Sequence, residues 1–188
     1  MTAAPFLTRL IHRFWTDERA AIAMETAIIT PVLAWCYITS FVFFDAFRTY
    51  SSSVKATYAI SDVISRQTMT LQRSDIDGYA ALLDNLVRAP GGVRLRVSQI
   101  VYDSDTDSHC VEWSQATNGE AALFTANLAD MRAALPTMVD AERLILVQSF
   151  IPYSPAFDIG IELLTFTNFT FTRPRYAGRI PFQTQNTC

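Results

Sequence analysis

The feature that most constrains this chain is an apolar run of 19 residues without a charge, Thr26 to Phe44. As a helix with a rise of about 1.5 Å per residue, the run would extend roughly 28 Å, close to the thickness of a bilayer's hydrocarbon core. It is apolar on every side, and a chain of 188 residues has too small a core to bury such a helix. We therefore predict one membrane span rather than a buried core helix.

The span is expected to remain in the mature protein. It is too long for a cleaved secretory signal and lacks a small-x-small exit. The stretch Leu33-Ala34-Trp35-Cys36 resembles a lipoprotein box, but Trp35 stands where a small residue is needed. Cys36 is most simply an apolar packing residue.

Charge indicates neither an orientation nor a nucleic-acid partner. Three arginines precede the span, and three basic residues follow it within about 20 residues, so the positive-inside rule gives a tie. The net charge of −3 provides no basic field, so nucleic-acid binding has no electrostatic support.

Helical spacing continues on both sides of the span. Residues 1–20 form a polar leader in which apolar residues recur at helical spacing, as in a helix on the cytoplasmic membrane surface; the alternative is a disordered tail. One helix is predicted from Ala20 to Leu71, because no Gly or Pro interrupts its period after Pro31. A second helix is expected from Ser74 or Asp75 to the Ala89–Gly92 stop.

Beyond residue 92 the apolar residues alternate, which is typical of strands. Strands are predicted at 93–102, 109–114 and 144–151, with another around Phe169 and Phe171; the first two form a hairpin, and the apolar third fits a central position. A short helix is expected at 127–135. The predicted fold is α+β: a cytoplasmic leader (1–20), a transmembrane and stem helix (21–71) and a small, mainly antiparallel sheet domain (72–188).

No catalytic, metal or cofactor site is predicted. Asp103, Asp105 and Asp107 alternate as calcium ligands can, but an EF-hand loop needs a Gly and a Glu where Ser108 and Ser114 stand, so a solvated turn is favoured. Neighbouring residues of a strand point to opposite faces, so a His109–Cys110 catalytic pair is excluded without a bulge. There is no GxSxG, P-loop or GxGxxG sequence.

The cysteines beyond the span allow one disulfide. Cys110 and Cys188 have no CxxC spacing and no histidine cluster that would suggest zinc. In an extracytoplasmic compartment a Cys110–Cys188 disulfide is plausible and would contribute about 4 kcal/mol in the chain-entropy model. Two unpaired thiols are the alternative.

The junction before the span has the pattern that prepilin peptidases cleave. A charged leader ending at Arg19 is followed by small residues and by one carboxylate, Glu25, just ahead of the uncharged run. Cleavage between Ala20 and Ala21 would make Glu25 the fifth residue of the mature chain. An unpaired carboxylate at the membrane edge costs a few kcal/mol. In a helical polymer each new N-terminal ammonium would neutralise the Glu25 of a neighbouring subunit. The alternative is an interfacial glutamate favoured by the helix dipole.

This N-terminus resembles that of TadE-like proteins, which are pseudopilins or minor pilins of Flp (tight-adherence, Tad) pilus systems. The resemblance lies in the Arg19–Glu25 pattern, in Ala27 and Pro31-Val32-Leu33, and more loosely in Asp140–Leu144, Phe150–Tyr153 and Arg173–Tyr176. Two departures are Ala20, where the family usually has Gly, and Thr26, where an aromatic residue is common. Ala20 in place of Gly favours slow cleavage of the leader or no cleavage. The chain is also much longer than a major Flp pilin.

The resemblance implies a non-enzymatic pilus component in the inner membrane, with a periplasmic C-terminal domain and possible incorporation into a cell-surface pilus. Its expected partners are other pilins and pseudopilins, the Tad assembly machinery, a prepilin peptidase and the lipid bilayer. One alternative is an uncleaved, membrane-anchored periplasmic adaptor of the same apparatus. A more distant one is a membrane-anchored periplasmic enzyme.

Overall fold

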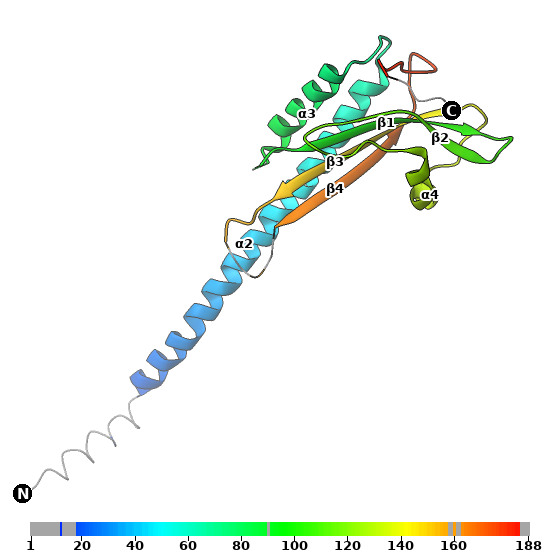
Figure 1. The fold of residues 1–188 in the computed structure, drawn as a ribbon. Helices are drawn as coiled ribbons and strands as arrows, with labels where there is room; N and C mark the ends of the chain where they lie inside the picture. The colour runs from blue at the N-terminus through cyan, green and yellow to red at the C-terminus, as the bar shows by residue number, and fades with distance from the viewer. Residues whose placement is uncertain (1–11, 13–17, 90, 158–159, 161–162, 185–188) are drawn as a thin grey trace, which may run out of the picture. The chain divides into compact units, whose positions relative to one another are not determined.

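The computed structural model describes residues 12, 18–89, 91–157, 160 and 163–184, and it divides into two compact units, Met1–Phe44 and Asp45–Cys188. The second half of the long helix belongs to the C-terminal unit. The elements, coloured along the chain in Figure 1, are α2 (Glu18–Ser65), α3 (Arg73–Val87), β1 (Arg94–Asp103), β2 (Ser108–Ala116), β3 (Arg143–Tyr153) and β4 (Leu164–Thr172), with the short turns η1 (Thr125–Asn127), α4 (Leu128–Met131) and η2 (Arg132–Ala134) after β2. The α+β class is confirmed.

The long helix is confirmed, but its predicted end at Leu71 is wrong. α2 ends at Ser65, whose carbonyl accepts a hydrogen bond from Arg175 N at 2.8 Å. Leu71 lies in a parallel bridge with Phe182, donating to Pro181 O at 2.9 Å and accepting from Gln183 N at 3.0 Å. The backbone N–H and C=O of Leu71 therefore form hydrogen bonds with the C-terminal segment instead of with α2. No Gly or Pro marks this break. The helical spacing of apolar residues continues past Ser65, so a prediction based on that spacing placed the end of the helix at Leu71.

The predicted second helix is confirmed as α3. Its start is fixed by Gln72, whose N–H donates to the Asp75 carboxylate at 2.8 Å. It ends at Val87 and is capped by Arg88, which has a left-handed φ of 55°; three residues later Gly91 has a φ of 97°. The turn into β1 therefore uses a glycine where a side chain would be strained.

The four strands form one antiparallel sheet in the order β2-β1-β3-β4. The predicted hairpin is confirmed as β1–β2, with a register shift between Gln99 and Ile100. The predicted central position of the third strand is also confirmed, since β3 pairs on both sides. The predicted helix at 127–135 is instead three short helical pieces, because η1, α4 and η2 change hydrogen-bond pattern every three or four residues.

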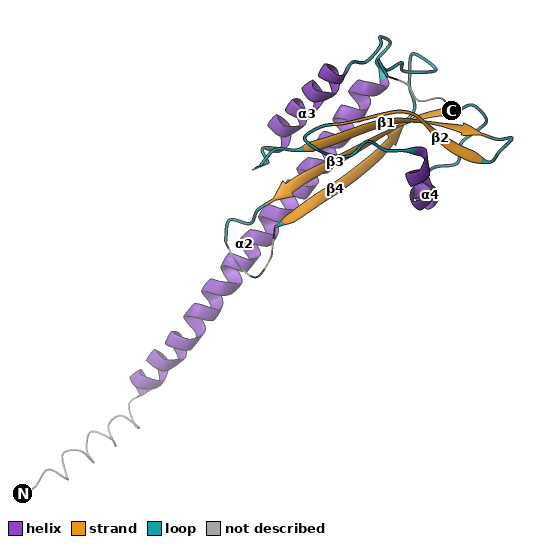
Figure 2. Ribbon diagram, in the orientation of Figure 1, coloured by secondary structure: helices purple, strands orange, loops and turns teal. Residues whose placement is uncertain are grey.

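The C-terminal unit has two hydrophobic cores, one on each face of its sheet. Figure 2 shows the helices and strands that enclose them. The larger core joins α2, α3 and the sheet, and Ile60, Leu83 and Ile145 in it are completely buried. The smaller one joins the other face to α4 through residues such as Ile100, Leu128 and Leu146. Ile145 and Leu146 enter different cores because neighbouring strand residues point to opposite faces.

We expect Ile60→Ala to lower the free energy of unfolding by about 3 kcal/mol, because it opens a cavity between α2 and the sheet. The control is Tyr58→Ala on the same helix, whose side chain is 59% exposed and whose loss should cost well under half as much. Equilibrium denaturation of the full chain in mild detergent, followed by near-UV circular dichroism, measures both. Equal costs would contradict this packing of α2.

Candidate functional site

The predicted processing site and assembly carboxylate lie together at the start of α2. Ala20 and Ala21 both lie within α2, near the N-terminal end of its described residues. Glu25 follows about one turn later and is exposed. No described residue forms an ion pair or a hydrogen bond with the Glu25 side chain. Its charge is therefore uncompensated within the described part of the chain.

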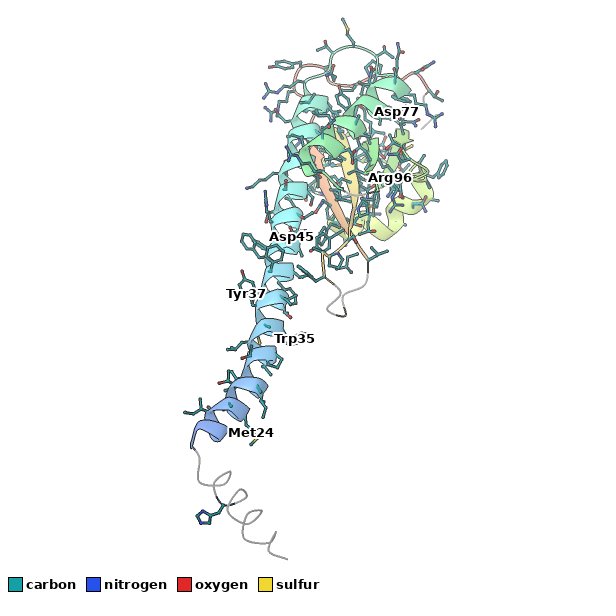
Figure 3. The ribbon with its side chains drawn as sticks, turned by 90° about the vertical axis from the view of Figure 1, so that its left-hand side faces the viewer. Met24, Trp35, Tyr37, Asp45, Asp77 and Arg96 are labelled. Carbon is teal, nitrogen blue, oxygen red and sulfur yellow. The ribbon has the colours of Figure 1, made fainter. Side chains whose placement is uncertain are left out.

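The helix around and beyond Glu25 exposes its apolar side chains in every direction. Every residue from Ile22 to Tyr37 is exposed, and Ile28 and Tyr37 expose 68% and 76% of their surface. Figure 3 shows Met24, Trp35 and Tyr37 projecting away from the helix. A soluble surface does not leave so large an apolar area in water. Among the described residues, this helix alone is long and apolar enough to cross a membrane.

Thr26 and Pro31 are two residues of this stretch that bear on the hydrogen bonds of the helix. The Thr26 hydroxyl donates to Ile22 O, one turn back, at 2.8 Å. Pro31 lies inside the helix and removes one backbone donor, which is tolerated better in membrane helices than in soluble ones. A surrounding of lipid tails or of other apolar helices suits these groups.

The three aspartates of the calcium alternative form a self-contained hairpin turn. Asp103 accepts from Asp105 N at 3.0 Å and from the Thr106 hydroxyl at 2.8 Å. Asp107 pairs with Arg132 at 2.6 Å. No three His, Cys, Asp or Glu side chains of the described ranges are grouped to hold a metal. The Asp103 and Asp107 carboxylates thus have protein partners already.

The cysteines are only partly described. Cys36 is exposed and free. Cys110 lies in β2, is disulfide-bonded and accepts a hydrogen bond from the Thr125 hydroxyl at 3.6 Å. Cys188 lies outside the described residues, so the Cys110–Cys188 pairing stays a prediction.

Sequence analysis missed a buried polar cluster that fixes α2 on the sheet. Thr57 of α2 and Ser149 of β3 share a 2.6 Å hydrogen bond, and the Asn168 amide of β4 donates to Ser53 at 2.9 Å. All four residues are buried. They are small polar residues scattered over three distant segments, so no local pattern connects them.

A second buried cluster ties the C-terminal segment to the sheet. Gln99 Oε1 accepts from Ile180 N at 3.0 Å, and its amide nitrogen donates to Glu112. Glu112 also pairs with Arg143 at 3.1 Å. Trp113 donates to Ile180 O at 2.9 Å and stacks on Phe182. These contacts are structural, since every polar atom in them has a protein partner.

Known proteins offer no independent guide to this chain. No family model, curated protein or solved structure matches it. The site is therefore argued from its own geometry: an uncompensated carboxylate, small residues ahead of it and an apolar helix exposed on all sides.

Hydrogen bonds from Arg132 and Tyr102 lower the pKa of the Asp107 carboxyl. A lowered folded-state pKa adds stability above the unfolded pKa, and this stability is lost as pH falls through the folded value. We expect Asp107→Asn to weaken the acid dependence of the melting temperature below about pH 4, and only slightly because the pair is exposed. Asp105→Asn, at an exposed aspartate of the same turn, should leave the acid dependence of the melting temperature unchanged. An equal effect of both variants would contradict the assignment.

Proposed function

We propose that this protein is a TadE-like pseudopilin or minor pilin, a structural component in the assembly of a Flp-type tight-adherence pilus. It is anchored in the inner membrane by the apolar run, with its C-terminal unit in the periplasm. The observation that supports this most is Glu25, an exposed acid without a described partner at the start of an apolar helix.

The chemistry of Glu25 explains why such a chain would assemble. A carboxylate at the edge of a bilayer is stabilised when a cation neutralises it. Cleavage at Ala20–Ala21 creates an ammonium four residues before Glu25, a spacing that places the two charges on one face of the helix. The ammonium of one subunit and the Glu25 of the next satisfy each other, and the exposed apolar side chains pack between them.

One observation favours the uncleaved adaptor as a second candidate. The Ala20–Ala21 bond lies inside α2, and a peptidase must open that turn to reach its backbone. Ala at both positions stabilises the helix, whereas the glycine usual in the family at residue 20 would loosen it by about 1 kcal/mol. The Ala20 departure therefore affects both recognition and access.

Mass spectrometry of the mature N-terminus distinguishes the two candidates. We expect a chain that begins at Ala21 in cells with a prepilin peptidase and at residue 1 in cells without it. Ala20→Gly should raise the cleaved fraction several-fold. Ala23→Gly loosens the same helix by a similar amount but lies away from the bond. An intact leader in both strains would support the adaptor.

We also expect Glu25→Gln to reduce co-purification with partner pilins about ten-fold or more, because each subunit then leaves an ammonium unpaired in the membrane. Membrane insertion and cleavage should remain. The control is Glu18→Gln, which removes an equal charge from the leader that cleavage discards. Normal assembly of the Glu25→Gln variant would rule out the proposed pairing.

A further inference from the structure

The unpaired basic side chains of the C-terminal unit are unevenly placed. Eight of its arginines form ion pairs with carboxylates: Arg66, Arg94, Arg96, Arg132, Arg143, Arg173, Arg175 and Arg179. In the described part of this unit, the basic residues without an ion pair are Arg48, Lys55, Arg73 and Arg88. Two of these, Arg48 and Arg88, line one cavity.

This cavity forms where three segments that are distant in sequence meet. Its volume is about 680 Å³, and its walls come from α2 after the apolar run, from the end of α3 and from the end of β3. Figure 1 shows the ends of α3 and β3 lying at the same end of the sheet. A volume of this size falls within the roughly 300–1,000 Å³ typical of small-molecule sites.

The cavity carries both signs of charge. Besides the two arginines, Asp45 lines it, and one Asp45 oxygen accepts a hydrogen bond from the Tyr153 hydroxyl at 3.2 Å. The carboxylate has further lone pairs for a second donor. Guanidinium groups bind phosphate oxygens in a forked, bidentate geometry. The cavity thus presents two phosphate-binding groups and one acceptor for an ammonium.

The position of these residues in the chain points to the source of such a ligand. Asp45 follows directly after Phe44, the last residue of the apolar run, and Arg48 comes three residues later in the same helix. At about 1.5 Å per residue, Arg48 lies roughly 6 Å along the helix from Phe44. The headgroup layer on each side of the hydrocarbon core is about 5–7 Å thick. In a chain that spans the membrane, the part of α2 that carries Asp45 and Arg48 falls within this headgroup layer.

We propose that this cavity binds the phosphoethanolamine headgroup of a membrane lipid. Arg48 and Arg88 hold the phosphodiester, and Asp45 accepts the primary ammonium. This inference rests on the membrane anchoring in the proposed function. It goes beyond that function because it assigns a specific lipid site to the C-terminal unit, whether or not the leader is cleaved.

Native mass spectrometry tests the site on the full chain released from nanodiscs that contain phosphatidylethanolamine and phosphatidylcholine. We expect one retained phosphatidylethanolamine. Arg48→Gln and Arg88→Gln should each reduce its occupancy about ten-fold, as the loss of a charge-assisted phosphate contact would. Arg73→Gln removes another unpaired arginine outside the cavity and should change nothing. Asp45→Asn should remove the preference over phosphatidylcholine but leave a phospholipid bound.

Three results would overturn the inference. The first is an equal loss in Arg73→Gln, which would indicate general charge attraction. The second is equally tight binding of soluble glycerophosphoethanolamine to lipid-free protein, which would make the ligand a free phosphate ester rather than a lipid. The third is stable insertion, shown by carbonate extraction, without a retained lipid; this result leaves the membrane anchor intact. Failure to insert would defeat the anchor and this site together.

Discussion

The whole structure depends on a helix whose two halves need different surroundings. From Ile22 to Tyr37 every residue of α2 is exposed, whereas Ile60 and Ile64 on its second half are completely buried. The first half gains its stability only where water is absent, because apolar surface in water is costly at about 25 cal/mol per Å². The second half is a core element of the sheet unit. One continuous helix therefore has an exposed apolar half and a half that is buried in the sheet unit.

The buried hydroxyl and amide contacts explain how the second half of α2 is held in register. Ile60 and Ile64 alone would allow the helix to slide or rotate, since apolar packing is not directional. The Thr57–Ser149 and Ser53–Asn168 hydrogen bonds are directional, and breaking either would leave buried polar atoms without partners. They fix the rotation and height of α2 on β3 and β4.

The regular elements were predictable because each has a local period. The apolar strand around Leu144–Ile151 predicted a central β3, and the uncharged run predicted the exposed helix. The end of α2 at Ser65 was not predictable, because it depends on contacts with residues 175 and 181–183, more than 100 positions later. The cavity with Arg48 and Arg88 was not predictable for the same reason. Its lining residues are distant in sequence and come together only in the folded chain. Among the candidate site residues, Glu25 was found because its chemistry lies within one turn.

The two ends of the apolar run treat their acidic residues differently. At one end Asp45 accepts a hydrogen bond from Tyr153 and shares a cavity with Arg48. At the other, Glu25 has no described partner. If both acids served only to mark the edges of the hydrophobic stretch, the same local compensation would be expected at each. The C-terminal unit supplies such compensation for Asp45. A cation for Glu25 would therefore come from the leader, from the N-terminal ammonium that cleavage creates, or from another molecule, and cleavage removes the first of these sources.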